Sequence, residues 1–317
     1  MGRYYDINIG GGLLRYTSPD GDANGGLNVE IDITVLPNDV TSSNSFVRVW
    51  GIPLEQLGPN YNLINEPVSV SGGFSAGLSL AKPQQRGILG TGQIFQSFGN
   101  WIGTDMTLDL VFLPGVTAPT SAGPNPTSVP KNIVLNWKKG QSLAQPLRQA
   151  LQTAFSSIPI GALNISSKLI AVQDQIGYHA NLDQFALYVR RITQDIMNDN
   201  RYPGVSIAVN GGKFVIDDGT SPQAFNGKIA FEDLIGQPTW IASKMIQWKC
   251  PMRADIKWGD TVTLPAGPVT YGPFSYPGIN QQVLFKGKFQ VTKIRHVGNF
   301  RQPDAASWVT IFDAQSI

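Results

Sequence analysis

The stretch LNVEIDITVL, Leu27 to Leu36, decides the fold class of this 317-residue chain. Apolar and polar side chains alternate along it, and successive side chains of a β-strand point to opposite faces. The apolar set is Leu27, Val29, Ile31, Ile33 and Val35, and the polar set is Asn28, Glu30, Asp32 and Thr34. This pattern predicts a half-buried strand with one face in water.

Two further stretches repeat the alternation. They are SFVRVWGI (45–52) and MTLDLVFL (106–113), with Arg48 and Asp109 on the polar side. The residues between the first two strands, PNDVTSSN, are typical of turns, and PLEQLG predicts one short helical turn. Residues 1–113 are therefore expected to form an antiparallel sheet or small barrel.

The composition supports a β-rich protein and excludes several function classes. Charged residues make up 15% of the chain, well below the usual quarter, and the net charge is +2. No basic stretch interleaves with aromatics as a nucleic-acid channel would require. No apolar run approaches the roughly 20 residues of a membrane span, and the start of the chain has no signal pattern. Cys250 is the only cysteine, so we expect a reducing compartment of synthesis and no internal disulfide.

A proline-rich linker and a change of period mark a second block. Residues 114–130 hold five prolines and almost nothing to bury, which is typical of an extended linker. Residues 131–228 then show helical spacing in SLAQPLRQALQTAF, with Ser142 and Gln145 as a predicted capping box, and in a second helix capped by Asn181. A hairpin about Asn210 completes a predicted α+β domain.

Residues 229–317 return to strands. Short β runs occur in QWKCPM, DTVTL, FQVTKI and SWVTIF, and a long proline-rich loop, 265–280, interrupts them. Loops of that length in compact domains are usually functional. The order β, α+β, β predicts two related β domains separated by an insertion.

One catalytic motif occurs in the sequence. GFSAG (73–77) matches the G-x-S-x-G nucleophile elbow, with Ser75 as the nucleophile. The elbow needs a helix directly after the serine, whereas LSLAKPQQRG alternates and is broken by Pro83. The two histidines supply no partner pattern: His179 precedes a helix cap, and His296 is expected at a strand corner, hydrogen-bonded to the backbone. We expect no catalytic residue.

Other kinds of site are equally weak. Two histidines and one cysteine make a zinc site improbable on spacing alone, and no phosphate loop occurs, so no metal or cofactor is expected. The carboxylate groups Glu232–Asp233 and Asp255 with Asp260 could in principle pair for glycoside hydrolysis, although solvated turns are the simpler explanation. The cluster of Trp240, Trp248 and Trp258 favours core or interface anchors over carbohydrate stacking.

The last block also resembles a known family. The segments KIAFEDLIGQPTWIASKMIQWKCPMRADIKWGDTVTLP and FKGKFQVTKIRHVGNFRQPDAASWVTIFDA are similar to the C-terminal part of baseplate hub proteins of contractile-tailed phages. The similarity lies in a Gly-Asp turn, an H-x-G corner at His296–Gly298 and a closing W-x-T strand at Trp308–Thr310. The order of strands in residues 1–113 and the inserted middle block agree with the same family.

The resemblance implies a fold and a function. The fold is mainly β with an α+β insertion: two tube-like antiparallel β-barrel domains (1–113 and 229–317) and a middle α+β domain (131–228). Such hubs are non-enzymatic homotrimers of the virion baseplate, assembled in the host cytoplasm, that adapt the sixfold tail tube to the threefold central spike and line the conduit.

The resemblance also implies partners. They are the tail tube or tube-initiator protein, the central spike, and the tape-measure and baseplate wedge proteins. DNA would be met only in transit, and no membrane is involved. Two alternative functions stay open: a β-rich capsid or decoration protein, and a cell-wall hydrolase or esterase that uses Ser75.

Overall fold

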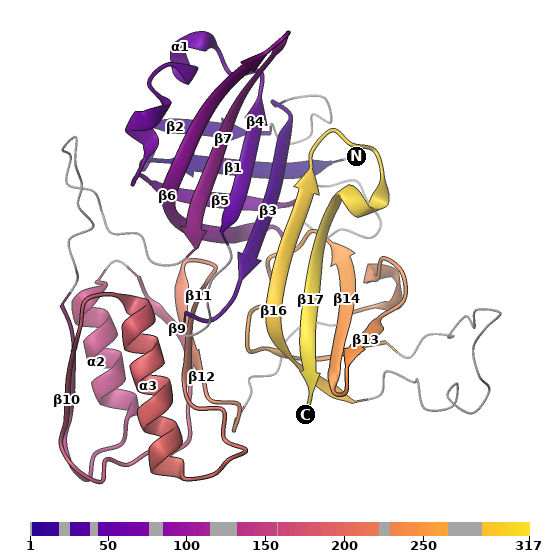
Figure 1. Cartoon of the computed structure of the whole chain (residues 1–317). Coiled ribbons are helices and arrows are strands. Elements are labelled where there is room, and N and C mark those ends of the chain that lie inside the picture. The colour runs from indigo at the N-terminus through magenta and orange to yellow at the C-terminus, as the bar shows by residue number, and fades with distance from the viewer. Residues whose placement is uncertain are drawn as a thin grey trace, which may run out of the picture.

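The computed structural model describes residues 2–18, 26–38, 44–75, 85–114, 132–156, 158–221, 229–265 and 287–317 (Figure 1). The described chain forms one large, curled antiparallel sheet and a middle unit of two helices and two small sheets. The predicted fold class, mainly β with an α+β insertion, is confirmed. The linker 115–130 and the loop 266–280 lie outside the described residues, so the predicted domain boundaries stay predictions.

The strands before the middle unit form the first half of the large sheet. They alternate between buried and partly exposed residues, as period-2 patterning requires. The elements are β1 (Arg3–Ile9), β2 (Leu14–Thr17), β3 (Val29–Val35), β4 (Ser45–Trp50), α1 (Leu54–Leu57), η1 (Asn60–Leu63), β5 (Pro67–Phe74), β6 (Gly87–Ile102) and β7 (Asp105–Pro114).

The middle unit packs two amphipathic helices against short strands. One small sheet pairs β8 with β10, and the other has the order β11-β12-β9, with β9 and β12 parallel. The elements are β8 (Ile133–Trp137), α2 (Ala144–Ala154), β9 (Ile160–Asn164), β10 (Gln175–His179), α3 (Leu182–Met197), β11 (Ser206–Asn210) and β12 (Lys213–Asp217).

The remaining strands form the second half of the large sheet. The strands are β13 (Thr239–Ala242), β14 (Met245–Pro251), β15 (Thr261–Thr263), β16 (Lys288–Asn299) and β17 (Trp308–Ser316). Two short 3-10 helices, η3 (Phe231–Asp233) and η4 (Ala305–Ser307), lie between them or before them. The main path through the sheet is β13-β14-β17-β16-β3-β4-β7-β6-β5-β1-β2, and β15 pairs with β16 beside that path.

The two β blocks share this sheet through one pairing. β3 and β16 run antiparallel from the Val35–Ile294 pair to the Glu30–Asn299 pair. Figure 1 shows the two strands side by side, with the first block above and the second below and to the right. The sequence predicted two related β domains but not that their strands continue into one sheet, because strand periodicity carries no information on distant partners.

Three hydrophobic clusters stabilise this arrangement. The first lies inside the curl of β1 to β7 and also includes Met252, Phe300 and Trp308 from the far end of the chain. The second fills the middle unit. The third lies under β14 to β17 and includes Val35 of β3 and Val215 of β12. The first and third clusters therefore combine residues that are far apart in the sequence.

The local turn and capping signals had mixed outcomes. Asn181 caps α3 as predicted, since its Oδ1 accepts the N–H of Gln184 at 2.9 Å. The hairpin at Asn210 is confirmed, with both following glycines at positive φ as a two-residue turn of this kind requires. The capping box at Ser142 is wrong: α2 begins at Ala144 without a side-chain cap, because Ser142 is held in a β-bridge to Ile170.

The H-x-G and W-x-T motifs face each other across β16 and β17. His296 pairs with Thr310 and Gly298 with Trp308. A side chain at Gly298 would come within 2.5 Å of the Trp308 ring, so only glycine allows this contact. Nδ1 of the buried His296 lies 2.9 Å from Oγ1 of Thr310, which itself bonds both the N–H and the carbonyl of Arg253. The expected backbone partner is therefore wrong: His296 lies within β16, and its hydrogen-bond partner is a threonine hydroxyl.

Arg3 fastens the first strand to the loop between β16 and β17. Its buried guanidinium donates to the carbonyl oxygens of Asn299, Phe300, Gln302 and Asp304 and to Oγ of Ser307, at 2.5–3.0 Å. Trp308 adds a bond from Nε1 to the carbonyl of Gly73 at 2.9 Å. The two ends of the described chain are thus joined by buried hydrogen bonds.

Replacing Arg3 by Ala should lower the free energy of unfolding by roughly 3–5 kcal/mol, because several buried carbonyl oxygens lose their donor together. Urea unfolding measures this loss. Arg15→Ala is the matched control. Arg15, on the neighbouring strand β2, forms an exposed ion pair with Asp6, so its replacement should have a much smaller effect. Equal losses for the two variants would contradict the role assigned to Arg3.

His296 should stay neutral across the physiological range, because burial, followed by the charge of Lys257, lowers its pKa to about 3. Its pKa in the unfolded chain is near 6.5, so the unfolded state binds the extra proton first. Stability is therefore present above about pH 6.5 and is lost as the pH falls toward 3. NMR titration of the ring should show no transition above about pH 4, whereas a transition near pH 6.5 would contradict this.

Candidate assembly interface

The continuous sheet presents one outward face across eight strands. The strands are β13, β14, β17, β16, β3, β4, β7 and β6, in that order. On β3, β4 and β7 the outward residues alternate with those of the first core, so Glu30, Arg48 and Asp109 form one cross-strand row. The prediction that Arg48 and Asp109 lie on the polar side is confirmed. Figure 1 shows this face toward the viewer.

Paired charges cover the middle of the face. Nε of Arg48 donates to Oδ1 of Asp109 and Nη2 donates to Oδ2, each at 2.7 Å, and Oδ2 also accepts from Asn100 at 3.2 Å. Arg295 of β16 forms the same two-bond pair with Asp32 of β3. These hydrogen bonds raise the pKa of both guanidinium groups. Each arginine is therefore bound to a carboxylate within the sheet.

Aromatic side chains hold Arg48 from both sides. Its guanidinium carbon lies 5.3 Å from the centre of the Phe46 ring and 5.5 Å from that of Trp50, within the range of cation–π attraction. The three residues are every second residue of β4, so their side chains lie on the same face of the strand. These contacts restrict the Arg48 side chain and so support its pairing with Asp109.

The two ends of the eight-strand face have open edges. At one end, β5 pairs only with β6 residues 87–93, so the same edge of β6 beyond Ile94 has no strand partner among the described residues; Leu57 and Asn60 of the α1–η1 segment lie against Gly99 in this part of β6. At the other end, β13 pairs with no described strand except β14, and all four of its residues are exposed. Unpaired edges are sites at which another chain can add a strand.

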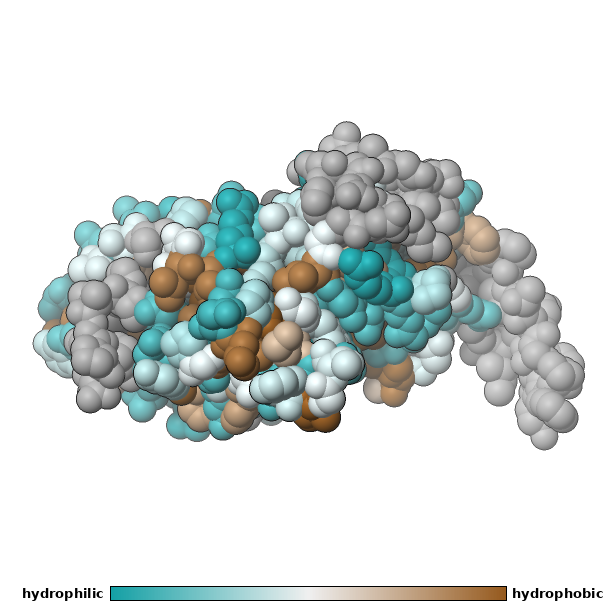
Figure 2. Space-filling model, turned by 90° about the horizontal axis from the view of Figure 1, so that it is seen from above, coloured by the Kyte–Doolittle hydropathy of each residue, from teal (hydrophilic) through white to brown (hydrophobic). Residues whose placement is uncertain are grey.

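Exposed apolar side chains accompany both edges. Along β6, between 48% and 76% of the residue surface is exposed at four residues: Phe95, Phe98, Trp101 and Ile102. On β13, Trp240 is 40% exposed and Ile241 is 46% exposed. Figure 2 views the end of the molecule that carries the β6–β7 turn and shows hydrophobic residues gathered in patches among polar ones. Large exposed apolar side chains beside unpaired backbone indicate a contact surface.

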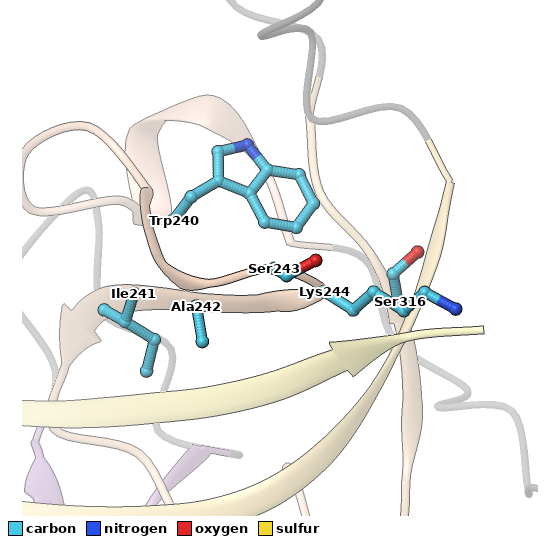
Figure 3. Close-up of a pocket in the computed structure, with 6 residues that line it drawn as sticks. All are labelled: Trp240, Ile241, Ala242, Ser243, Lys244 and Ser316. Atoms are coloured by element: carbon cyan, nitrogen blue, oxygen red, sulfur yellow. The ribbon is translucent and has the colours of Figure 1, made fainter. Parts of the chain in front are cut away.

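A shallow hollow lies beside β13. Its volume is about 490 Å³, and its lining comes from the β13–β14 hairpin and the end of β17. Figure 3 shows the Trp240 ring on one side and the Lys244 chain and Ser316 on the other. The ring also contacts Phe289 edge-on at 6.0 Å, so the core supports it from below. Trp248 and Trp258 are buried in the third cluster, so the predicted tryptophan group divides into two core residues and one edge residue.

Ser75 bonds the backbone of the first strand region through the carbonyl of Gly2. It is buried, and both its N–H and its hydroxyl donate to the carbonyl of Gly2, at 2.6 and 3.1 Å. These bonds extend the pairing of β5 with β1 by one residue. The residues after the serine, 76–84, lie outside the described chain, so the helix that an elbow requires is untested.

Three of the candidate carboxylates, Asp233, Asp255 and Asp260, have partners within the fold. Asp255 forms a two-bond pair with the buried Arg253 at 2.7 Å, and Asp233 lies 3.7 Å from the same guanidinium. Asp233 is buried and Asp255 and Asp260 are partly buried, so the expectation that all of them lie in solvated turns is wrong. Sequence could not show this, because Arg253 meets both Asp233 and Asp255 only in the folded structure, where Asp260 accepts the N–H of Lys257.

The described residues hold neither a group of metal ligands nor a membrane-spanning helix. No three His, Cys, Asp or Glu side chains gather there as a metal ion would need. No described helix is both long and apolar enough to cross a membrane.

Comparison with solved structures identifies the fold. The chain aligns over 99% of its length with 97% of the 43 kDa tail protein of prophage MuSo2 from Shewanella oneidensis, at 11% identity and a TM-score of 0.53. A tail protein from Neisseria meningitidis MC58 aligns over 100% of this chain and 97% of its own, at 10% identity and a TM-score of 0.49. A Francisella PdpA–VgrG complex contains a chain that aligns over 99% of this one and 58% of its own, at 8% identity and 0.48.

Comparison of the sequence alone finds nothing. No protein-family model matches the chain, and no curated protein matches it. At such low identity only strand order and packing carry the likeness. The chain has the fold of a prophage tail protein over its whole length.

Proposed function

We propose that this protein is a structural component of a phage tail: a baseplate hub of which three copies close a ring between the sixfold tail tube and the threefold central spike. The eight-strand face is the observation that supports this most strongly. It consists of two four-strand halves, β13-β14-β17-β16 and β3-β4-β7-β6, joined side by side. Three copies bring six such halves, which reconciles threefold and sixfold symmetry in one ring.

The open edges give a way to close that ring. The edge of β13 in one copy pairs with the free part of β6 in the next, which removes both unpaired edges and covers the apolar side chains beside them. The contact is heterologous, because it joins two different surfaces, and such contacts form closed rings when the rotation between copies is a simple fraction of a turn. The hollow beside Trp240 offers room for side chains of the neighbouring copy.

The outward face would then line the conduit. Its arginines are already bound to Asp109 and Asp32, so these two cations are less available to a passing polyanion, whereas Lys249 of β14 lies exposed on the same face. DNA binding by proteins depends on cations that neutralise phosphates. A lining with paired charges is therefore suited to DNA in transit, and no step of catalysis is assigned to it.

The same proposal assigns partners and a location. The ring belongs to the virion baseplate and is assembled in the bacterial cytoplasm. Its two rims contact the tail tube or tube-initiator protein on one side and the central spike on the other, with tape-measure and wedge proteins nearby. The full-length likeness to a prophage tail protein supports this assignment.

Light scattering of the purified protein tests the ring. A closed trimer of 34.3 kDa chains has a mass of about 103 kDa. Ile241→Lys on β13 and Ile102→Lys at the end of β6 should each shift the mass toward the monomer, because a charged side chain at a strand edge disfavours pairing with another strand. Val172→Lys is the matched control, since Val172 is 70% exposed in the middle unit and should leave the trimer intact.

A monomer at every concentration, or edge variants that form trimers as readily as the control, would contradict the proposed ring. Negative-stain images of the trimer should show a ring with a central opening, whereas closed shells would favour a capsid protein.

A further inference from the structure

An exposed tryptophan lies at the end of β6, next to the turn into β7. Trp101 is 66% exposed. Its Nε1 donates to the carbonyl of Gly103 at 3.0 Å, so the only polar group of the side chain already has a partner. The rest of the indole presents carbon surface to water. Apolar surface of this size is stabilised when another surface covers it.

Trp101 lies on the core side of the sheet. It pairs with Met106, which packs against the first hydrophobic cluster, and directly opposite residues of an antiparallel pair point to the same face. Two positions earlier on this face is Gly99, where a Cβ would come within 2.8 Å of the carbonyl oxygen of Leu57. The α1–η1 segment therefore covers the sheet at Gly99, and Trp101 is the large exposed side chain that follows it.

The hollow beside Trp240 belongs to the core side of the other end of the sheet. Trp240 pairs with Ile246, which is buried in the third cluster, and its ring contacts Phe289 of the same cluster. Figure 3 shows the hollow between that ring and the Lys244 chain. An indole placed there would meet an aromatic ring on one side and an ammonium group on the other, and both attract an aromatic ring.

The two core sides are one side of the continuous sheet. β16 and β3 carry residues of both clusters on the same face: Ile294 is opposite Val35 in the third cluster, and Gly298 is opposite Ile31 in the first. Trp101 and the hollow beside Trp240 therefore lie at opposite ends of one sheet and on the same side of it.

Strand directions decide how these two ends can meet. Every neighbouring pair across the eight-strand face is antiparallel. An even number of alternating strands makes β13 and β6 run in opposite directions. A rotation about an axis along the strands keeps these directions, so β13 of the next copy adds to β6 antiparallel and with its core side on the same side.

We propose that Trp101 of one copy inserts into the hollow beside Trp240 of the next copy and anchors the contact between them. The inference rests on the proposed ring and names the side chain that holds it together. An aromatic side chain buried in a fitting pocket at the centre of an interface commonly carries a large share of the binding energy. Each copy supplies one such side chain and one hollow, as a closed ring of heterologous contacts requires.

Association of the full chain tests the anchor. Trp101→Ala should raise the protein concentration at which half of the trimer dissociates by more than about 30-fold, measured by light scattering across a dilution series. Tyr178→Ala is the matched control, because Tyr178 lies in the middle unit and is 67% exposed, almost the same as Trp101. It should leave the association unchanged, and equal behaviour of the two variants would overturn the proposal.

A double-variant cycle shows whether the two tryptophans act on each other. If Trp101 occupies the hollow, the effects of Trp101→Ala and Trp240→Ala on association are not additive, and the double variant is little weaker than either single variant. Additive effects would overturn the placement of Trp101 in the hollow.

A photo-crosslink gives a second measurement that needs no change at Trp240. Benzoylphenylalanine in place of Trp101 keeps an aromatic side chain at the end of β6. Irradiation should join it to residues 239–244 of another copy, as a covalent oligomer that mass spectrometry maps, whereas the same group in place of Tyr178 should not reach that segment. A wild-type trimer without this crosslink would overturn the anchor and leave the ring standing. A wild-type chain that stays monomeric at every concentration would overturn both.

Discussion

The antiparallel pairing of β3 with β16 is the interaction on which the rest of the structure depends. It joins strands more than 250 residues apart, as the pair Asp32–Arg295 with its separation of 263 shows. Without it the two β blocks would be separate sheets, each with another open edge. The Arg3 bonds to the loop after β16 and the Trp308 contact with Gly73 are possible only because this pairing brings the chain ends together.

The same pairing gives the molecule its assembly geometry. Joining two four-strand halves leaves β13 and the free part of β6 without a further strand partner at the two ends of the eight-strand face, among the described residues. A polar face with internally paired charges lies between them. Low surface charge, open edges and exposed apolar side chains are costly for an isolated chain, and they are consistent with one that is covered by neighbours.

Parts of the fold and the interface could be predicted from local patterns. Alternation in 27–36 placed Glu30 and Asp32 on the wet face, and the side-chain oxygen of Asn181 marked a helix start. The prediction at Ser142 failed because a β-bridge to Ile170 competes for the same backbone. Trp240 was grouped with two core tryptophans, since composition cannot show that its strand ends the sheet.

Sequence by itself determined which residues alternate, where helices replace strands, and that the chain is mainly β. It also carried the H-x-G and W-x-T motifs, whose residues at matching spacing become cross-strand pairs on β16 and β17. Only the tertiary structure decided that β3 meets β16, that Arg3 binds a loop at the other end of the chain, and that Gln290 of β16 binds Asp217 of β12. The reason is physical: side-chain periodicity depends on the backbone of a few neighbouring residues, whereas the choice of partner depends on register and packing over the whole chain.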